Sequence, residues 1–169
     1  DKKSPLYVVG RDFSWQPAAW NLSGQEFSLR GRRGYYEKLF IPLLGRHQLV
    51  NAATAVAAAE VLIDLGVSLN ADMVRRGLAR TRWPGRMEIV SQKPLVIIDG
   101  AHNYDGARCL RQALKDYFPG RSIVLVIGML GDKERARVAA ELAGAARAVV
   151  VTRPDNPRAH NWRELAEEV

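Results

Sequence analysis

The sequence predicts an α/β protein whose second half has a mostly parallel sheet with helices on both sides. Two observations support this prediction. After Pro84 and Gly85, short apolar runs alternate with helix-forming stretches, which is the order typical of βα units. Before that point the order differs, because short strands come first and two helices follow. The change of order at Pro84 indicates two structural parts in one chain.

The elements expected before Pro84 are three strands and two helices. Gly31 and Gly34 bracket a turn between two strand-like runs, which predicts a hairpin. Gly66 closes a long run of good helix formers, as glycine commonly does at a helix C-terminus. The strands are expected at residues 6–10, 26–30 and 35–41, and the helices at residues 46–66 and 70–81.

After Pro84 the sequence predicts four strands and three helices. Pro94 falls in the turn between the first two strands. The run SIVLVIG is continuously apolar, as in a strand that is buried on both faces of a sheet. Strands are expected at residues 87–91, 95–99, 122–128 and 148–152, and helices at residues 104–118, 133–144 and 161–169.

Composition restricts the kind of protein. The net charge is +7, which favours anionic partners, but the arginines are dispersed and no nucleic-acid motif is present. We therefore expect a nucleotide or an acidic substrate as partner, with no nucleic acid and no membrane. The single cysteine, Cys109, excludes an internal disulfide and a cysteine-based metal cluster, and a cytoplasmic protein is expected.

Candidate chemistry begins in the loop DGAHN, which follows an expected strand. Ligands of parallel sheets lie at the carboxyl ends of the strands, where we also expect the loops GMLGDKE and TRPDNPRAH. Asp99 can accept hydrogen bonds from ribose hydroxyls, and His102 can donate to a phosphate or act as an acid or base. The alternative is structural, because Asp and Asn are common in such turns and Asn103 can cap the next helix.

Two further candidate groups precede that loop. His47 and Asn51 are four residues apart and share one helix face, where the Asn51 amide offers the donor and acceptor that match an adenine edge. The alternative is that both are helix-start residues satisfied by the backbone. Arg86, near Arg80 and Arg82, can clamp a phosphate through its planar guanidinium, or can belong to a solvated basic linker.

Several motifs in one order resemble a known family. The stretches LLGRHQLVNAATAVAAAEVL, TRWPGRMEIV, VIIDGAHNYDGA and VIGMLGDKE resemble folylpolyglutamate synthase/dihydrofolate synthase, of the Mur ligase superfamily. The resemblance implies an ATP-dependent amide ligase. In that family, ATP phosphorylates a pteroate or folate carboxylate, and the amino group of L-glutamate attacks the acyl phosphate. ATP lies between a central P-loop domain and a Rossmann-like C-terminal domain.

The resemblance also implies residue roles. Asn51 would hold the adenine region, Arg86 would reach the phosphates, and Asp99 would bind the ribose, with His47 as a further ATP-binding candidate. His102 would lie near the reaction centre as the candidate catalytic residue. Residues 1–83 would be the tail of the P-loop ATPase domain, residues 84–86 the linker, and residues 87–169 a truncated C-terminal domain.

The same resemblance places other parts of the enzyme upstream. No phosphate loop of the pattern G-x-x-x-x-G-K-S/T occurs in this sequence, so we expect no catalysis from this chain alone. The magnesium ligands would also lie upstream. The expected partners are ATP, Mg²⁺, L-glutamate and dihydropteroate or tetrahydrofolate, bound by a full-length monomer. The alternatives are another Mur-type ligase, acting on a cell-wall precursor, and a nucleotide-binding module without catalysis.

Overall fold

The structure is a computed structural model that describes residues 4–130, 134–159 and 162–167. The chain divides into two compact units, Asp1–Met87 and Glu88–Val169. This division falls close to the linker expected at residues 84–86. The identity of each unit as a piece of a particular ligase domain stays a prediction.

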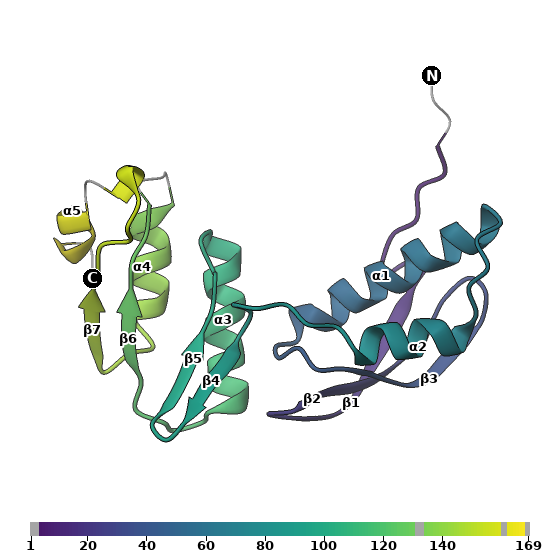
Figure 1. Ribbon diagram of the computed structural model, residues 1–169, viewed down its shortest axis with the longest axis horizontal. Coiled ribbons are helices and arrows are strands. Elements are labelled where there is room, and N and C mark those ends of the chain that lie inside the picture. The colour runs from purple at the N-terminus through teal and green to yellow at the C-terminus, as the bar shows by residue number, and fades with distance from the viewer. Residues whose placement is uncertain (1–3, 131–133, 160–161, 168–169) are drawn as a thin grey trace. The chain divides into compact units, whose positions relative to one another are not determined.

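The first unit contains a three-stranded antiparallel sheet and two helices (Figure 1). The expected hairpin is confirmed, since β2 pairs antiparallel with β3 around the turn at Gly31–Gly34. Both expected helices are also present, and Gly66 adopts a positive φ after the first of them. The elements are β1 (Ser14–Asn21), β2 (Gly24–Arg30), β3 (Tyr35–Ile41), α1 (His47–Asp64) and α2 (Ala71–Ala79).

The strand expected at residues 6–10 is wrong, and the strand β1 was not expected. The apolar run ends in a turn at Gly10, and Val9 forms only an isolated bridge with Phe13. β1 includes Pro17, which local propensity disfavours in a strand. The sheet tolerates it because β1 is an edge strand, where proline removes no central ladder hydrogen bond.

The core of the first unit lies between the sheet and α1. Alternate residues of β2 and β3 are buried, among them Phe27, Leu29 and Leu39. The facing side of α1 is a stripe with a spacing of four residues: Gln48, Ala52, Val56 and Glu60 are all buried. Two polar residues thus occupy the ends of an apolar stripe.

The second unit carries two strand pairs and three helices. Its elements are β4 (Glu88–Gln92), β5 (Leu95–Ile98), α3 (Tyr104–Tyr117), β6 (Val124–Ile127), α4 (Arg135–Ala143), β7 (Ala148–Val151) and α5 (Trp162–Glu167). A single turn of 3₁₀ helix spans Pro157–Ala159. All expected strands and helices of this half are confirmed within their described residues; the expected helix starts at Lys133 and Asn161 lie outside those residues.

Strand pairing in the second unit is parallel in one pair and antiparallel in the other. β6 and β7 are parallel, in line with the α/β expectation, while β4 and β5 form an antiparallel hairpin around Pro94. The helices pack on one face of the strands (Figure 1), where Leu125, Val149 and Val151 meet α4 and α5. The prediction of helices on both sides of the sheet is therefore wrong for the described residues.

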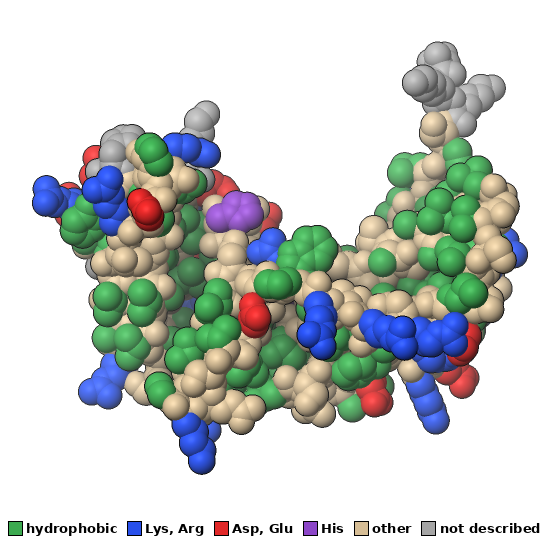
Figure 2. Space-filling view, in the orientation of Figure 1, with side chains coloured by type: hydrophobic (Ala, Val, Ile, Leu, Met, Phe, Trp, Pro, Cys, Tyr) green, Lys and Arg blue, Asp and Glu red, His purple; other side chains and the backbone are tan. Residues whose placement is uncertain are grey.

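The expectation that residues 122–128 are buried on both faces is wrong for this chain. Val124 and Val126 are 61% and 65% exposed, and Val150 on β7 is 50% exposed. Hydrophobic side chains accordingly gather over these strands in Figure 2. The reason is that the helices in the core of this unit all pack against the other set of side chains on these strands, such as Leu125 and Val149. None of the described helices is long and apolar enough to cross a membrane.

Candidate functional site

Three loops meet at the carboxyl ends of the strands in the second unit, as the sequence predicted. Glu134, from the loop after β6, accepts a hydrogen bond of 3.1 Å from the backbone N–H of Tyr104, at the start of α3. The backbone N–H of Thr152, after β7, donates to the carbonyl of Ile127 over 2.8 Å. Gly128 lies so close to Thr152 and Pro154 that a Cβ atom there would be only 3.0 Å from Thr152. Residues 131–133 of the middle loop lie outside the described residues.

Asp99 has a structural contact within its own loop. Its Oδ1 accepts a hydrogen bond of 2.8 Å from the backbone N–H of Ala101, which closes an Asx turn. Asn103 caps α3 as expected, because its Oδ1 accepts from the N–H of Gly106 over 2.8 Å. The structural alternative for this loop is therefore observed in part. A carboxylate has about four acceptor positions, so the bond to Ala101 does not by itself exclude a ligand.

The ring of His102 is oriented by the backbone. Its Nδ1 lies 2.9 Å from the carbonyl oxygen of Gly100. A carbonyl only accepts hydrogen bonds, so Nδ1 carries a proton, and in a neutral ring Nε2 is then the accepting nitrogen. The side chain is exposed. In a catalytic triad a carboxylate holds the Nδ1 proton, whereas here the carbonyl of Gly100 holds it.

His47 and Asn51, the two candidates on α1, are joined through a third side chain. Nε2 of Gln48 lies 3.0 Å from Nε2 of His47, and Oε1 of Gln48 accepts a hydrogen bond of 3.0 Å from Nδ2 of Asn51. Gln48 is buried, while Asn51 is exposed. The structural alternative expected the backbone to satisfy both residues, but these side-chain atoms contact Gln48 instead. His47, Gln48 and Asn51 thus form a relay of side-chain contacts.

A second buried glutamine fixes the chain just before α1. Nε2 of Gln25, on β2, donates to the carbonyl oxygens of Leu43 and Gly45 over 2.7 and 3.0 Å. Gly45 has a φ of +97°, a conformation that glycine adopts without strain. These contacts tie the start of α1 to the sheet, so the sheet positions the relay of His47, Gln48 and Asn51.

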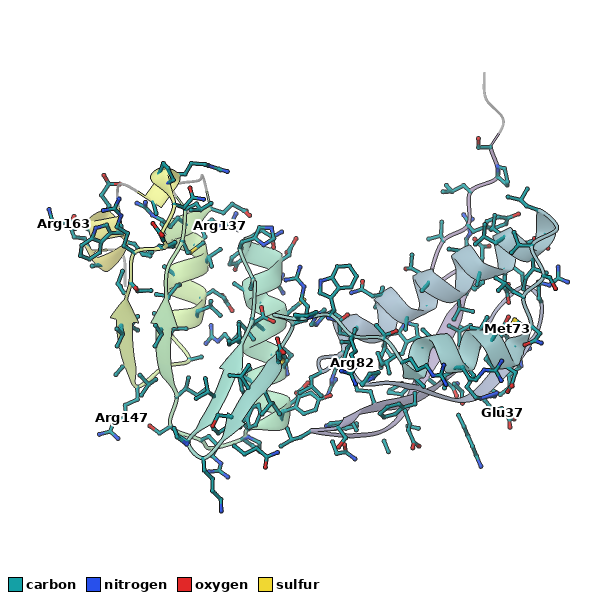
Figure 3. All side chains as sticks on the ribbon, viewed as in Figure 1. Glu37, Met73, Arg82, Arg137, Arg147 and Arg163 are labelled. Atoms are coloured by element: carbon teal, nitrogen blue, oxygen red, sulfur yellow. The ribbon has the colours of Figure 1, made fainter. Side chains whose placement is uncertain are left out.

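Arg86 lies in the segment between α2 and β4, which also contains Arg82, labelled in Figure 3. Arg82 and Trp83 are exposed, and Arg86 is partly buried. Among the described residues, none forms a hydrogen bond or an ion pair with the guanidinium of Arg86. A partly buried guanidinium without a partner among the described residues is suited to bind an anionic ligand.

The remaining features of the second unit do not identify a nucleotide site. A shallow groove along α3 is lined by Arg108, Arg111 and Lys115 among others, and by none of the candidate residues. Within the described ranges, no three side chains of His, Cys, Asp or Glu are placed to hold a metal ion.

Sequence reasoning missed two residues that organise the candidate site, Gln48 and Glu134. Gln48 had a detectable signal, because it is a polar residue in the buried i, i+4 stripe of α1. Glu134 had none, since its partner Tyr104 is 30 residues away in the chain.

Comparison with known proteins assigns the chain to a family. Residues 85–169 match the family described as "Mur ligase, glutamate ligase domain". The dihydrofolate synthase/folylpolyglutamate synthase of Mycobacterium tuberculosis is 40% identical over 147 residues, which are 86% of this chain and 30% of that protein.

A solved structure and a second relative extend this result. The Mycobacterium tuberculosis folylpolyglutamate synthase complexed with ADP and AMPPCP has a TM-score of 0.83 and 37% identity, over 95% of this chain and 36% of that one. The UDP-N-acetylmuramoyl-L-alanyl-D-glutamate–2,6-diaminopimelate ligase of Wolinella succinogenes is 32% identical, over 96% of this chain and 36% of its own length. The chain thus spans about a third of the length of these relatives. It belongs to the Mur ligase family, as a member similar to the folylpolyglutamate and dihydrofolate synthases.

Proposed function

We propose that these residues are part of an ATP-dependent amide ligase that adds L-glutamate to dihydropteroate or a folate. The observation that carries this proposal is the similarity to folylpolyglutamate synthase, which extends over 95% of the chain at 37% identity and includes a structure with bound nucleotides. The reaction would transfer the γ-phosphoryl group of ATP to the pteroate or folate carboxylate. The glutamate amine would then attack the acyl phosphate, forming the amide and releasing phosphate.

The proposed ATP contacts follow the chemistry of each side chain. Asn51 presents an amide to the adenine, and His47 supports it through Gln48. Arg86 offers a planar guanidinium, without a described partner, to the phosphates. Asp99, held by the amide of Ala101, accepts hydrogen bonds from the ribose.

His102 is the proposed catalytic residue of this part of the protein. Because Gly100 holds its Nδ1 proton, its exposed Nε2 can accept a proton from an attacking amine. The phosphate loop and the magnesium ligands are proposed to lie outside residues 1–169.

A second candidate function rests on the Wolinella relative, which is named as a ligase for 2,6-diaminopimelate and a UDP-muramoyl peptide. Its similarity covers 96% of the chain, so a cell-wall precursor is a real alternative substrate. Identity is higher to the folate enzyme, at 40% against 32%, and this favours the folate reaction.

The deciding experiment is an assay of the full-length protein with ATP and each substrate pair. We expect ADP release that requires both L-glutamate and dihydropteroate or tetrahydrofolate, with a product heavier by one glutamyl residue in mass spectrometry. Activity only with a UDP-muramoyl peptide and a diamino acid would establish the alternative. The 169-residue chain alone is expected to show no ATP-dependent ligation, since it contains no phosphate loop.

A further inference from the structure

Gln48 is a buried amide that contacts two candidate site residues at once. It is only 6% exposed, and the next two residues along the same stripe of α1, Ala52 and Val56, are apolar. Its amide oxygen faces Nδ2 of Asn51 and its amide nitrogen faces Nε2 of His47, each at 3.0 Å. Buried polar groups are almost always hydrogen-bonded, so both contacts are expected to persist in solution.

Donor and acceptor rules make this relay directional. The amide nitrogen of Gln48 only donates, so Nε2 of His47 must be the bare, accepting nitrogen, and the neutral ring carries its proton on Nδ1. The amide oxygen of Gln48 only accepts, so it engages one hydrogen of Asn51 Nδ2. With one N–H bound in this way, the amide of Asn51 cannot exchange its oxygen and nitrogen without breaking the relay.

We propose that Gln48 is a positioning residue that fixes the amide of Asn51 and thereby makes the site selective for adenine. This inference rests on the proposed function, because it takes Asn51 as the residue that meets the base. With Nδ2 held by Gln48, Asn51 presents Oδ1 as an acceptor together with its second N–H. Adenine carries an amino donor at position 6, where guanine carries an oxygen acceptor. Guanine would therefore place one acceptor against another.

The relay is also well anchored. The chain before His47 is held by Gln25, whose amide donates to the carbonyls of Leu43 and Gly45. Leu49, between Gln48 and Asn51 in the helix, and Ala52, which follows Asn51, are buried in the core of the unit. These contacts fix the backbone at the start of α1, so the orientation of the Asn51 side-chain amide depends mainly on its hydrogen bond to Gln48.

The first test needs no nucleotide. In the 169-residue chain, ¹⁵N NMR of the histidine rings reports which nitrogen carries the proton. We expect His47 in the Nδ1–H form in the wild type and a mixture of both forms in Gln48→Met, which keeps the length of the side chain but removes both hydrogen bonds. Gln112→Met, on the exposed side of α3, is the matched control and should leave His47 unchanged. An Nε2–H form in the wild type would overturn the proposal without any variant.

The second test measures base selectivity in the full-length protein, as the ratio of kcat/KM for ATP and GTP. Gln48→Met should lower this ratio on the order of tenfold, which is about the effect of one hydrogen bond. Gln48→Glu should preserve most of the ratio, because a carboxylate also accepts from Nδ2 of Asn51. Gln112→Met should have no effect.

The outcomes separate this inference from the proposed function. A wild-type protein that uses no nucleotide at all would contradict both. A wild type that uses ATP, together with an unchanged ATP-to-GTP ratio in Gln48→Met, would overturn only the role of Gln48. Equal losses of selectivity in Gln48→Met and Gln48→Glu would also overturn it, since the acceptor for Asn51 is retained in one variant only.

Discussion

The hydroxyl of Tyr36, on β3, donates a hydrogen bond of 3.0 Å to the carboxylate of Glu60, on α1. The same carboxylate, which is fully buried, accepts from the backbone N–H groups of Arg32 and Arg33 over 2.9 and 3.2 Å. Arg32 and Arg33 form the turn of the β2–β3 hairpin. One carboxylate of α1 therefore holds both the turn and the following strand, and it replaces the water that these polar groups would otherwise bind.

We predict that Tyr36 ionises late. Burial, followed by the hydrogen bond to Glu60, raises the pKa of Tyr36 to about 12. Because the pKa in the folded state is raised, the stabilisation is complete below the unfolded-state pKa of about 10 and is lost as the pH rises from there towards 12. A spectrophotometric titration of the 169-residue chain should show a late phase that belongs to Tyr36. Tyr36→Phe should remove that late phase; its persistence would contradict the assignment.

We predict that Gly31→Ala destabilises the first unit. A Cβ atom at Gly31 would collide with the carboxylate of Glu60, which is itself fixed by three donors. Displacing a buried carboxylate from its donors typically costs about 1–3 kcal/mol, and the midpoint of urea unfolding should fall accordingly. Gly34→Ser is not a suitable control, because Gly34 has a φ of +152°. Gly77→Ala is a better one, since a Cβ atom there has open space on the exposed part of α2.

Local signals were sufficient to predict much of this fold. Gly31 and Gly34 predicted the hairpin, and the helix formers before Gly66 predicted α1, because turns and helices depend on neighbouring residues. β1 was missed because an edge strand containing Pro17 is defined by its partner β2, not by its own propensity. The exposed Val124 and Val126 were also missed, since burial depends on which face the helices cover.

The candidate site shows the same limit. The carboxyl ends of strands indicated Asp99 and His102, and the three strand-end loops do meet there. The sequence did not reveal that Gly100 orients His102, or that Gln48 joins His47 to Asn51. These contacts join residues that are close in the chain, but they depend on side-chain rotamers, which residue spacing does not determine.

We predict that Arg86→Lys impairs use of ATP by the full-length protein. Lysine keeps the charge but cannot form the two parallel hydrogen bonds of a guanidinium with a phosphate. The loss of a charge-assisted contact of this kind is worth roughly 1.5–3 kcal/mol, as a raised KM for ATP, a lower kcat or both. Arg82→Lys, an exposed arginine in the same segment, is the matched control and should be neutral. Unchanged kinetics for Arg86→Lys would make it a linker residue only.

We predict that Asp99 sets a preference of the full-length protein for ATP over 2′-deoxy-ATP, if it binds the 2′-hydroxyl of the ribose. A site that holds a hydroxyl rejects an analogue that lacks it, because its own polar group is left unpaired. Asp99→Ala should weaken use of ATP by roughly 1.5–3 kcal/mol and affect 2′-deoxy-ATP much less, so the preference should shrink. The quantity to measure is kcat/KM for both nucleotides.

Asp99→Asn separates this role from the turn that Asp99 also stabilises. An asparagine can still accept from the N–H of Ala101 through its amide oxygen, so the Asx turn is retained, while the charge that attracts the ribose hydroxyls is lost. We therefore expect the preference to shrink in Asp99→Asn as well as in Asp99→Ala. If Asp99 instead oriented His102 for proton transfer, both substitutions would slow turnover equally with the two nucleotides and leave the preference intact. The hydrogen bond from His102 Nδ1 to the carbonyl of Gly100 argues against that role, because this proton already has an acceptor. An unchanged ratio of the two kcat/KM values would exclude a 2′-hydroxyl contact and leave either a 3′-hydroxyl contact or the orientation of His102 as the role of Asp99.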